Sequence, residues 1–220
     1  MKTKIKICGI TTAADSACAA DAGADYAGVI VEIRGSPRAV AVGTAERICA
    51  RSSIPVIILL DKHRSDIADA AARIRPGGVQ LIGDYTPDDI RMLKRTLACP
   101  LWKTFRVPRK STDARLVSDL SDEIGRACRA GLDAVVLDTL VPKQKGGTGL
   151  TCDWNTAARI VALAAAPVFL AGGIHPGNAA DAAQSVRPAG IDVSSGVEKK
   201  PGVKDRQKII SLIARVAAMP

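Results

Sequence analysis

The strongest constraint in this sequence is a repeated alternation of short apolar runs with longer segments of helical periodicity. Eight runs rich in Val, Ile and Leu are each followed by a segment whose apolar residues recur at helical spacing. We expect strands at 4–10, 25–31, 54–60, 78–82, 101–105, 134–137, 168–171 and 191–194. We expect helices ending at 22, beginning at 86, and spanning 43–50, 65–74, 119–130, 154–165, 178–185 and 205–217.

This alternation predicts an α/β fold, a single (β/α)8 TIM barrel that covers residues 1–220 as one domain. No composition break and no Pro- or Ser-rich linker divides the chain. A doubly wound open sheet is the alternative, but such a sheet has no need of the eighth unit. The apolar fraction of 47% with only 3% aromatic residues suits strands that are covered on both faces.

Local signals mark several element ends. Thr12 followed by Asp15 resembles a capping box, and Thr86 precedes a proline at the first helical position with acidic residues behind it. Gly23 is expected to stop the first helix. The connection at 32–42 is unusually long, and long loops at this end of a barrel are places where function tends to reside.

The formal charge of +9 raises the question of an anionic partner such as nucleic acid. The Lys and Arg residues form only short groups, at 2–6, 106–110, 143–145 and 199–204, so no nucleic-acid partner is predicted. We expect most of these cations on the solvated surface and a few near an anionic substrate.

The six cysteines form no CxxC pair, and neither a secretory signal nor a membrane-spanning run is evident. A reduced cytoplasmic protein without disulfides, structural zinc or membrane contact is therefore predicted.

Candidate site residues follow from position, because barrel active sites lie at the C-terminal ends of the strands. Cys8 ends the first expected strand and Asp138 the sixth, while Arg38 lies in the second loop. Each has a simpler alternative: Cys8 could be a buried, inert thiol, Asp138 could satisfy a neighbouring loop, and Arg38 could form a loop salt bridge. His63 and His175 stand apart without metal-ligand spacing and are expected on the surface or in loops.

The segment 170–205 carries two glycine-rich strand ends, each before a further helical pattern. Glycine lets an anion approach the backbone, and a helix N-terminus favours negative charge, so the segment is expected to bind phosphate. A further cluster, Gly-Gly-Thr-Gly at 146–149, closes over a ligand or only permits a tight turn.

Ordered motifs along nearly the whole chain resemble the phosphoribosylanthranilate isomerase family of tryptophan biosynthesis. They are KICGIT at 6–11, SPR at 36–38, VQL at 79–81, LDT at 137–139, GGTG at 146–149, DW at 153–154, AGGI at 171–174, and DVSSGVE with PGVKD within 192–205. The resemblance implies an Amadori rearrangement of N-(5′-phosphoribosyl)anthranilate, by general acid–base catalysis without metal or organic cofactor, in a monomer or homodimer.

The resemblance also implies roles for individual residues. Cys8 matches the family's general base and Asp138 its general acid, while Arg38 matches the residue that holds the anthranilate carboxylate. The remaining substrate-binding positions, four of which match the backbone phosphate grip, are Gln80, Gly147, Gly172, Gly173, Ser195 and Gly196.

The sequence departs from the family pattern at a few pocket positions. Ile82 stands where the family usually has a histidine, and the second and third strands lack the usual aromatic residues. Two alternatives therefore stay open: a related barrel isomerase that acts on another phosphorylated sugar, and a non-catalytic sensor of a phosphorylated ligand.

Overall fold

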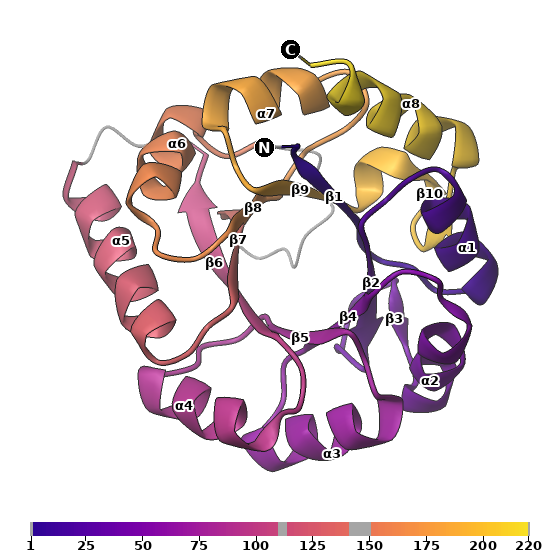
Figure 1. Ribbon diagram of the computed structural model, residues 1–220, viewed down its shortest axis with the longest axis horizontal. Coiled ribbons are helices and arrows are strands. Elements are labelled where there is room, and N and C mark those ends of the chain that lie inside the picture. Colours follow the sequence, from indigo (N-terminus) through magenta and orange to yellow (C-terminus); the bar gives the residue numbers. More distant parts are fainter. Residues whose placement is uncertain (1, 110–113, 141–150, 220) are drawn as a thin grey trace.

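Eight parallel strands close into a barrel surrounded by eight α-helices in the described part of the chain (Figure 1). The structure is a computed structural model that describes residues 2–109, 114–140 and 151–219. The barrel strands are β1 Lys4–Ile7, β2 Tyr26–Val31, β4 Val56–Leu60, β5 Gly78–Leu81, β6 Leu101–Pro108, β7 Ala134–Leu140, β8 Val168–Leu170 and β9 Gly190–Val193. Pairing of β1 with both β2 and β9 completes the ring, so the predicted TIM barrel is confirmed and the open sheet is wrong.

One helix follows each barrel strand. The helices are α1 Ala13–Asp21, α2 Val42–Arg51, α3 Arg64–Ile74, α4 Pro87–Thr96, α5 Ala114–Arg129, α6 Trp154–Leu163, α7 Ala179–Val186 and α8 Arg206–Ala217. Most differ from the predicted ranges by only a residue or two. The larger differences are β1, which ends three residues before the predicted end, β6 and β7, which each run three residues beyond it, and α5, which begins five residues before the predicted start.

Thr86 and Thr12 cap their helices as predicted, although the capping box expected at Thr12 is only half formed. The Thr86 hydroxyl accepts a hydrogen bond from the Asp89 N–H, and the Asp89 carboxylate accepts one from the Thr86 N–H, which makes a complete capping box. Thr12 caps α1 through a bond from the Asp15 N–H. Gly23 follows α1 with φ of +97°, a conformation that favours glycine.

Two small features were not predicted from the sequence. The long connection after β2 contains β3, Ala39–Val40, which pairs in parallel with the end of β2. After β9 come a 3-10 turn, η1 Ser195–Val197, and an antiparallel hairpin of β10 Glu198–Lys200 and β11 Val203–Lys204. Both features lie at strand C-termini, so they add to the mouth of the barrel.

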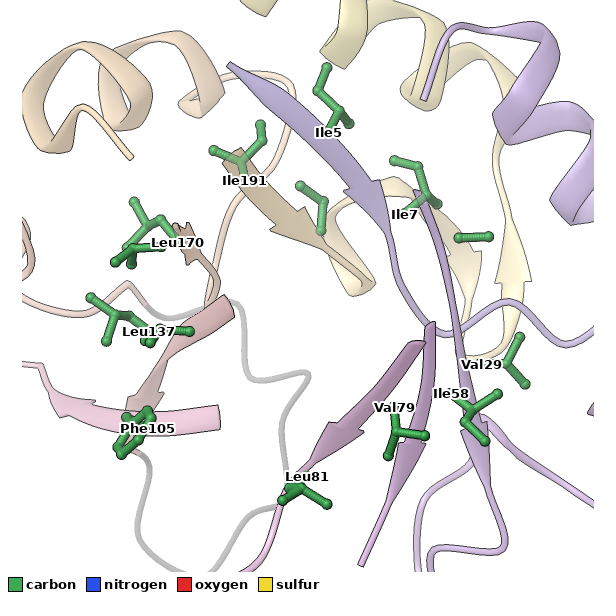
Figure 2. Close-up of a cluster of buried hydrophobic side chains, with 14 of the residues drawn as sticks. Ile5, Ile7, Val29, Ile58, Val79, Leu81, Phe105, Leu137, Leu170 and Ile191 are labelled. Carbon is green, nitrogen blue, oxygen red and sulfur yellow. The ribbon is translucent and has the colours of Figure 1, made fainter. Parts of the chain in front are cut away.

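The main hydrophobic core lies between the strands and the helices, whereas the barrel interior is partly polar. Alternate strand residues such as Ile5, Ile7, Val29, Ile58 and Leu137 belong to the core (Figure 2), and each helix contributes buried side chains to it. A separate cluster lies inside the barrel, with its aromatic rings near the N-terminal ends of the strands. It consists of Tyr26, Ile57, Trp102, Ala134, Val136, Phe169 and Ala171. Its aromatic rings meet at centroid distances of 4.6–5.8 Å, so the barrel is closed at that end.

In the described residues, no helix combines the length and apolarity needed to cross a membrane. The six cysteines are free thiols.

Candidate active site

A pocket opens at the C-terminal ends of the barrel strands and brings together most of the residues that the sequence singled out. Its lining includes Cys8, Arg38, Gln80, Asp138, Gly172, Gly173 and Ser195. Gly196 directly follows Ser195, whereas Gly147 lies outside the described residues. Seven predicted positions from six different strand ends therefore share one cavity.

Cys8 follows the last residue of β1, and its thiol is buried beside Gly28 of β2. The Cys8 N–H donates to the Val193 carbonyl at 2.8 Å, which ties the end of β1 to β9. A side chain at Gly28 would place its Cβ 2.9 Å from the Cys8 Sγ, so the glycine leaves room for the thiol. Burial raises the pKa of Cys8, and the nearby Lys6 and Lys204 ammonium groups act in the opposite direction.

Lys6 lies inside the barrel and pairs with the pocket residue Asp192, but sequence analysis assigned it no individual role, because it belongs to a short basic group of which most members were expected on the surface. Its side chain is 0% exposed inside the barrel, and Nζ lies 2.7 Å from Oδ2 of Asp192 on the adjacent strand β9. Burial alone lowers the Lys6 pKa, but Asp192 and Cys8 together outweigh it, through charge and hydrogen bonding, and leave the pKa raised. The sequence did contain a signal for this position. Side chains two residues apart in a strand point to the same face, so Lys6 is expected on the same face as Cys8.

Asp138 lies in β7, two residues before the strand ends at Leu140, and not at the strand end as predicted. Its Oδ1 accepts a hydrogen bond from the Thr139 N–H at 2.8 Å. Burial raises the pKa of Asp138, and the negative charge of Asp192 adds to the rise. Arg106 of β6 pairs in register with Asp138 and lines the same pocket, so a cation stands beside the carboxyl group.

Arg38 directly precedes β3 and is held by Glu198 at the start of β10. Its Nε and Nη2 donate to the two carboxylate oxygens of Glu198 at 2.9 and 2.8 Å. Lys204 donates to Glu198 Oε1 at 2.9 Å and to the Ser194 carbonyl at 3.2 Å. Burial would raise the pKa of Glu198, but these bonds outweigh it and keep the pKa low. Sequence analysis assigned no individual role to Glu198 or to Lys204, although both are buried.

The glycine-rich strand ends adopt backbone conformations that few other residues allow. Gly172 and Gly173 have φ of +86° and +64°. A Cβ at Gly172 would lie 2.0 Å from Thr139 Oγ1, and one at Gly196 would lie 2.0 Å from the Ile174 carbonyl oxygen. Within the described residues, the N–H groups of Gly173, Ser195 and Gly196 donate no backbone hydrogen bond. These amides suit an anionic group at the pocket wall.

Gln80 and Ile82 come from β5 and the residue that follows it. The Gln80 Nε2 donates to Thr104 Oγ1 at 2.9 Å, while its Oε1 is buried without a partner in the described chain. Ile82 lines the pocket, which makes this wall aliphatic. Across residues 2–109, 114–140 and 151–219, no group of His, Cys, Asp and Glu is arranged to bind a metal ion, and both histidines are exposed.

A family model and the most similar relatives identify the family of the chain. A family model described as "N-(5'phosphoribosyl)anthranilate (PRA) isomerase" matches residues 5–215. An N-(5′-phosphoribosyl)anthranilate isomerase from Methanocella arvoryzae is 35% identical over 220 residues, which cover 97% of this chain and 98% of the relative. The solved structure of the isomerase from Pyrococcus furiosus is 29% identical with a TM-score of 0.84 and covers 98% of each chain.

A further solved structure carries a ligand. It is a phosphoribosyl anthranilate isomerase in complex with reduced 1-(o-carboxyphenylamino)-1-deoxyribulose 5-phosphate. This neighbour is 24% identical with a TM-score of 0.81, and the match covers 99% of this chain and 100% of the neighbour, so the likeness shows a shared fold.

Proposed function

The chain belongs to the N-(5′-phosphoribosyl)anthranilate isomerase family, and we propose that its barrel-mouth pocket performs the family's Amadori rearrangement. The substrate is N-(5′-phosphoribosyl)anthranilate and the product is 1-(2-carboxyphenylamino)-1-deoxyribulose 5-phosphate. The observation that carries the proposal is the shared pocket, in which a buried carboxyl group and a buried thiol come from strands β7 and β1. C2 of the sugar is oxidised as C1 is reduced, so the enzyme is an aldose–ketose isomerase.

Asp138 is the proposed general acid for ring opening. The carboxyl proton passes to the ribose ring oxygen as the bond between that oxygen and C1 breaks, which leaves a Schiff base with the anthranilate nitrogen. A carboxyl group must hold its proton near neutral pH to do this, and burial raises the Asp138 pKa in that direction.

Cys8 is the proposed general base for the next step. Its thiolate removes the proton from C2 of the Schiff base, which gives an enolamine that then becomes the ketone product. Burial opposes thiolate formation, but the Lys6 and Lys204 ammonium groups favour it. The reacting form is therefore the one in which Cys8 has lost its proton while Asp138 keeps its own.

The two ends of the substrate are held by opposite sides of the mouth. The phosphate lies against the backbone amides of Gly172, Gly173, Ser195 and Gly196 in this proposal, which their backbone geometry supports. Arg38 receives the anthranilate carboxylate through Nη1, since Glu198 accepts only Nε and Nη2 in the described contacts. Gln80 and Gly147 complete the set of proposed substrate contacts. Holding both ends fixes the sugar between acid and base.

We further propose that the chain works as one domain over residues 1–220, without metal or organic cofactor, in the cytoplasm. A monomer or a homodimer fits this proposal, and size-exclusion chromatography with light scattering distinguishes the two. A mass equal to a higher oligomer would contradict it.

The proposed function is tested by following the loss of anthranilate fluorescence during turnover by the purified wild-type protein. We expect turnover of N-(5′-phosphoribosyl)anthranilate well above the buffer rate. The same protein should turn over a phosphorylated aminosugar without the aromatic acid more slowly, because Arg38 then has no carboxylate to bind. Absence of turnover, or faster turnover of the phosphorylated aminosugar that lacks the aromatic acid, would count against the assignment.

A further inference from the structure

Asp192 is a buried carboxylate on the pocket wall for which the proposed mechanism has no use. Its side chain projects from β9 into the barrel and is 6% exposed. Oδ2 accepts a hydrogen bond from Lys6 Nζ at 2.7 Å, whereas Oδ1 has no hydrogen-bond partner within the described residues. One oxygen is therefore anchored, and the other is a buried acceptor without a partner in the described residues, on a side chain that lines the cavity.

The chemistry of this acceptor selects a class of ligand group. A buried carboxylate oxygen is costly without a donor, and its charge repels the phosphate and the carboxylate of the substrate. Gln80 lines the same pocket, and its Oε1 is also a buried acceptor without a partner in the described chain. Hydroxyl groups are the donors that a phosphorylated sugar offers between its two charged ends.

We propose that Asp192 binds the sugar directly, its Oδ1 accepting a hydrogen bond from a ribose hydroxyl while Lys6 holds Oδ2. The inference rests on the proposed function and adds a sugar-recognition residue to it. The ion pair restrains the carboxylate, because Lys6 is 0% exposed and the two residues are register partners on adjacent strands. Binding therefore requires no reordering of the side chain.

The test measures how much each sugar hydroxyl contributes to binding. Isothermal titration calorimetry compares reduced 1-(o-carboxyphenylamino)-1-deoxyribulose 5-phosphate with analogues that lack the C3 or the C4 hydroxyl. For the wild type, we expect one analogue to bind about ten- to a hundredfold more weakly, which is the usual size for a hydrogen bond to a charged group. In Asp192→Asn that penalty should fall to about threefold or less, because the charged acceptor is gone.

Two further variants keep the test decisive. Lys6→Met/Asp192→Leu removes both charges together, so it stays informative if the single variant fails to fold, and it should also lose the penalty. Asp133→Asn makes the same substitution at an exposed Asp that pairs with Lys94, and it should keep the full wild-type penalty.

Equal affinities of wild type for all three ligands, or an unchanged penalty in the Asp192 variants, would overturn the inference while turnover still supports the proposed function. If wild type neither binds the parent compound nor turns over substrate, the proposed function fails, and the inference fails with it.

Discussion

Replacing Lys6 by methionine should destabilise the barrel strongly, because it leaves Asp192 as a buried, uncompensated charge. The Lys6 side chain is 0% exposed and that of Asp192 is 6% exposed, with 2.7 Å between Nζ and Oδ2. Removal of one partner from such a buried pair costs about 3–5 kcal/mol, a large share of the roughly 5–15 kcal/mol that stabilises a typical domain. Urea unfolding followed by far-UV circular dichroism measures the loss, provided that the m-values of variant and wild type agree.

Lys4→Met is a matched control on the same strand. Lys4 forms an ion pair with Asp25 at the same distance of 2.7 Å, but its side chain is 51% exposed. Its loss should be far smaller, since water screens an exposed pair. The double variant Lys6→Met/Asp192→Leu should recover most of the lost stability, because no unpaired charge remains. Equal losses for Lys4→Met and Lys6→Met would refute the reasoning that burial sets the cost.

Two further predictions concern catalysis. Gly172→Ala should raise KM about tenfold or more. A Cβ there would lie 2.0 Å from Thr139 Oγ1 and the residue has φ of +86°, so the substitution should displace the backbone amides proposed to bind phosphate. An unchanged KM would contradict that role. The profile of kcat/KM against pH should be bell-shaped, with its maximum between the raised pKa values of Asp138 and Cys8. The charge of Asp192 raises both pKa values, so Asp192→Asn should move both limbs to lower pH, and limbs that stay in place would be inconsistent with this coupling.

Much of the fold could be predicted because its causes are local. Thr86 and Asp89 satisfy each other's backbone groups within one turn, and the apolar run of β4 is fully buried as its composition predicts. The predicted ends of strands and helices were wrong where tertiary contacts determine them. The pairing of β6 with β7 runs from Trp102 to Pro108, and no local pattern in the sequence shows this register.

The location of a candidate residue could be predicted where it lies at or near a strand end. Cys8 and Asp138 were expected there, and both line the pocket. Glu198 was missed because its partner Arg38 is 160 residues away in the chain, and such a pairing leaves no periodic trace. Lys6 was missed for a different reason: its charge suggested the surface, although the barrel interior also accepts a charge that has a buried partner.

The most direct test of the proposed acid–base mechanism compares kcat in the wild type, Cys8→Ala and Asp138→Asn by the fluorescence assay. Each substitution should lower kcat by about 10²–10⁴-fold, the usual contribution of a general acid or base, while affinity for the reduced product analogue changes little. Cys18→Ala removes a thiol from α1 that does not line the pocket and should leave kcat unchanged. Wild-type kcat in either Cys8→Ala or Asp138→Asn would contradict the mechanism.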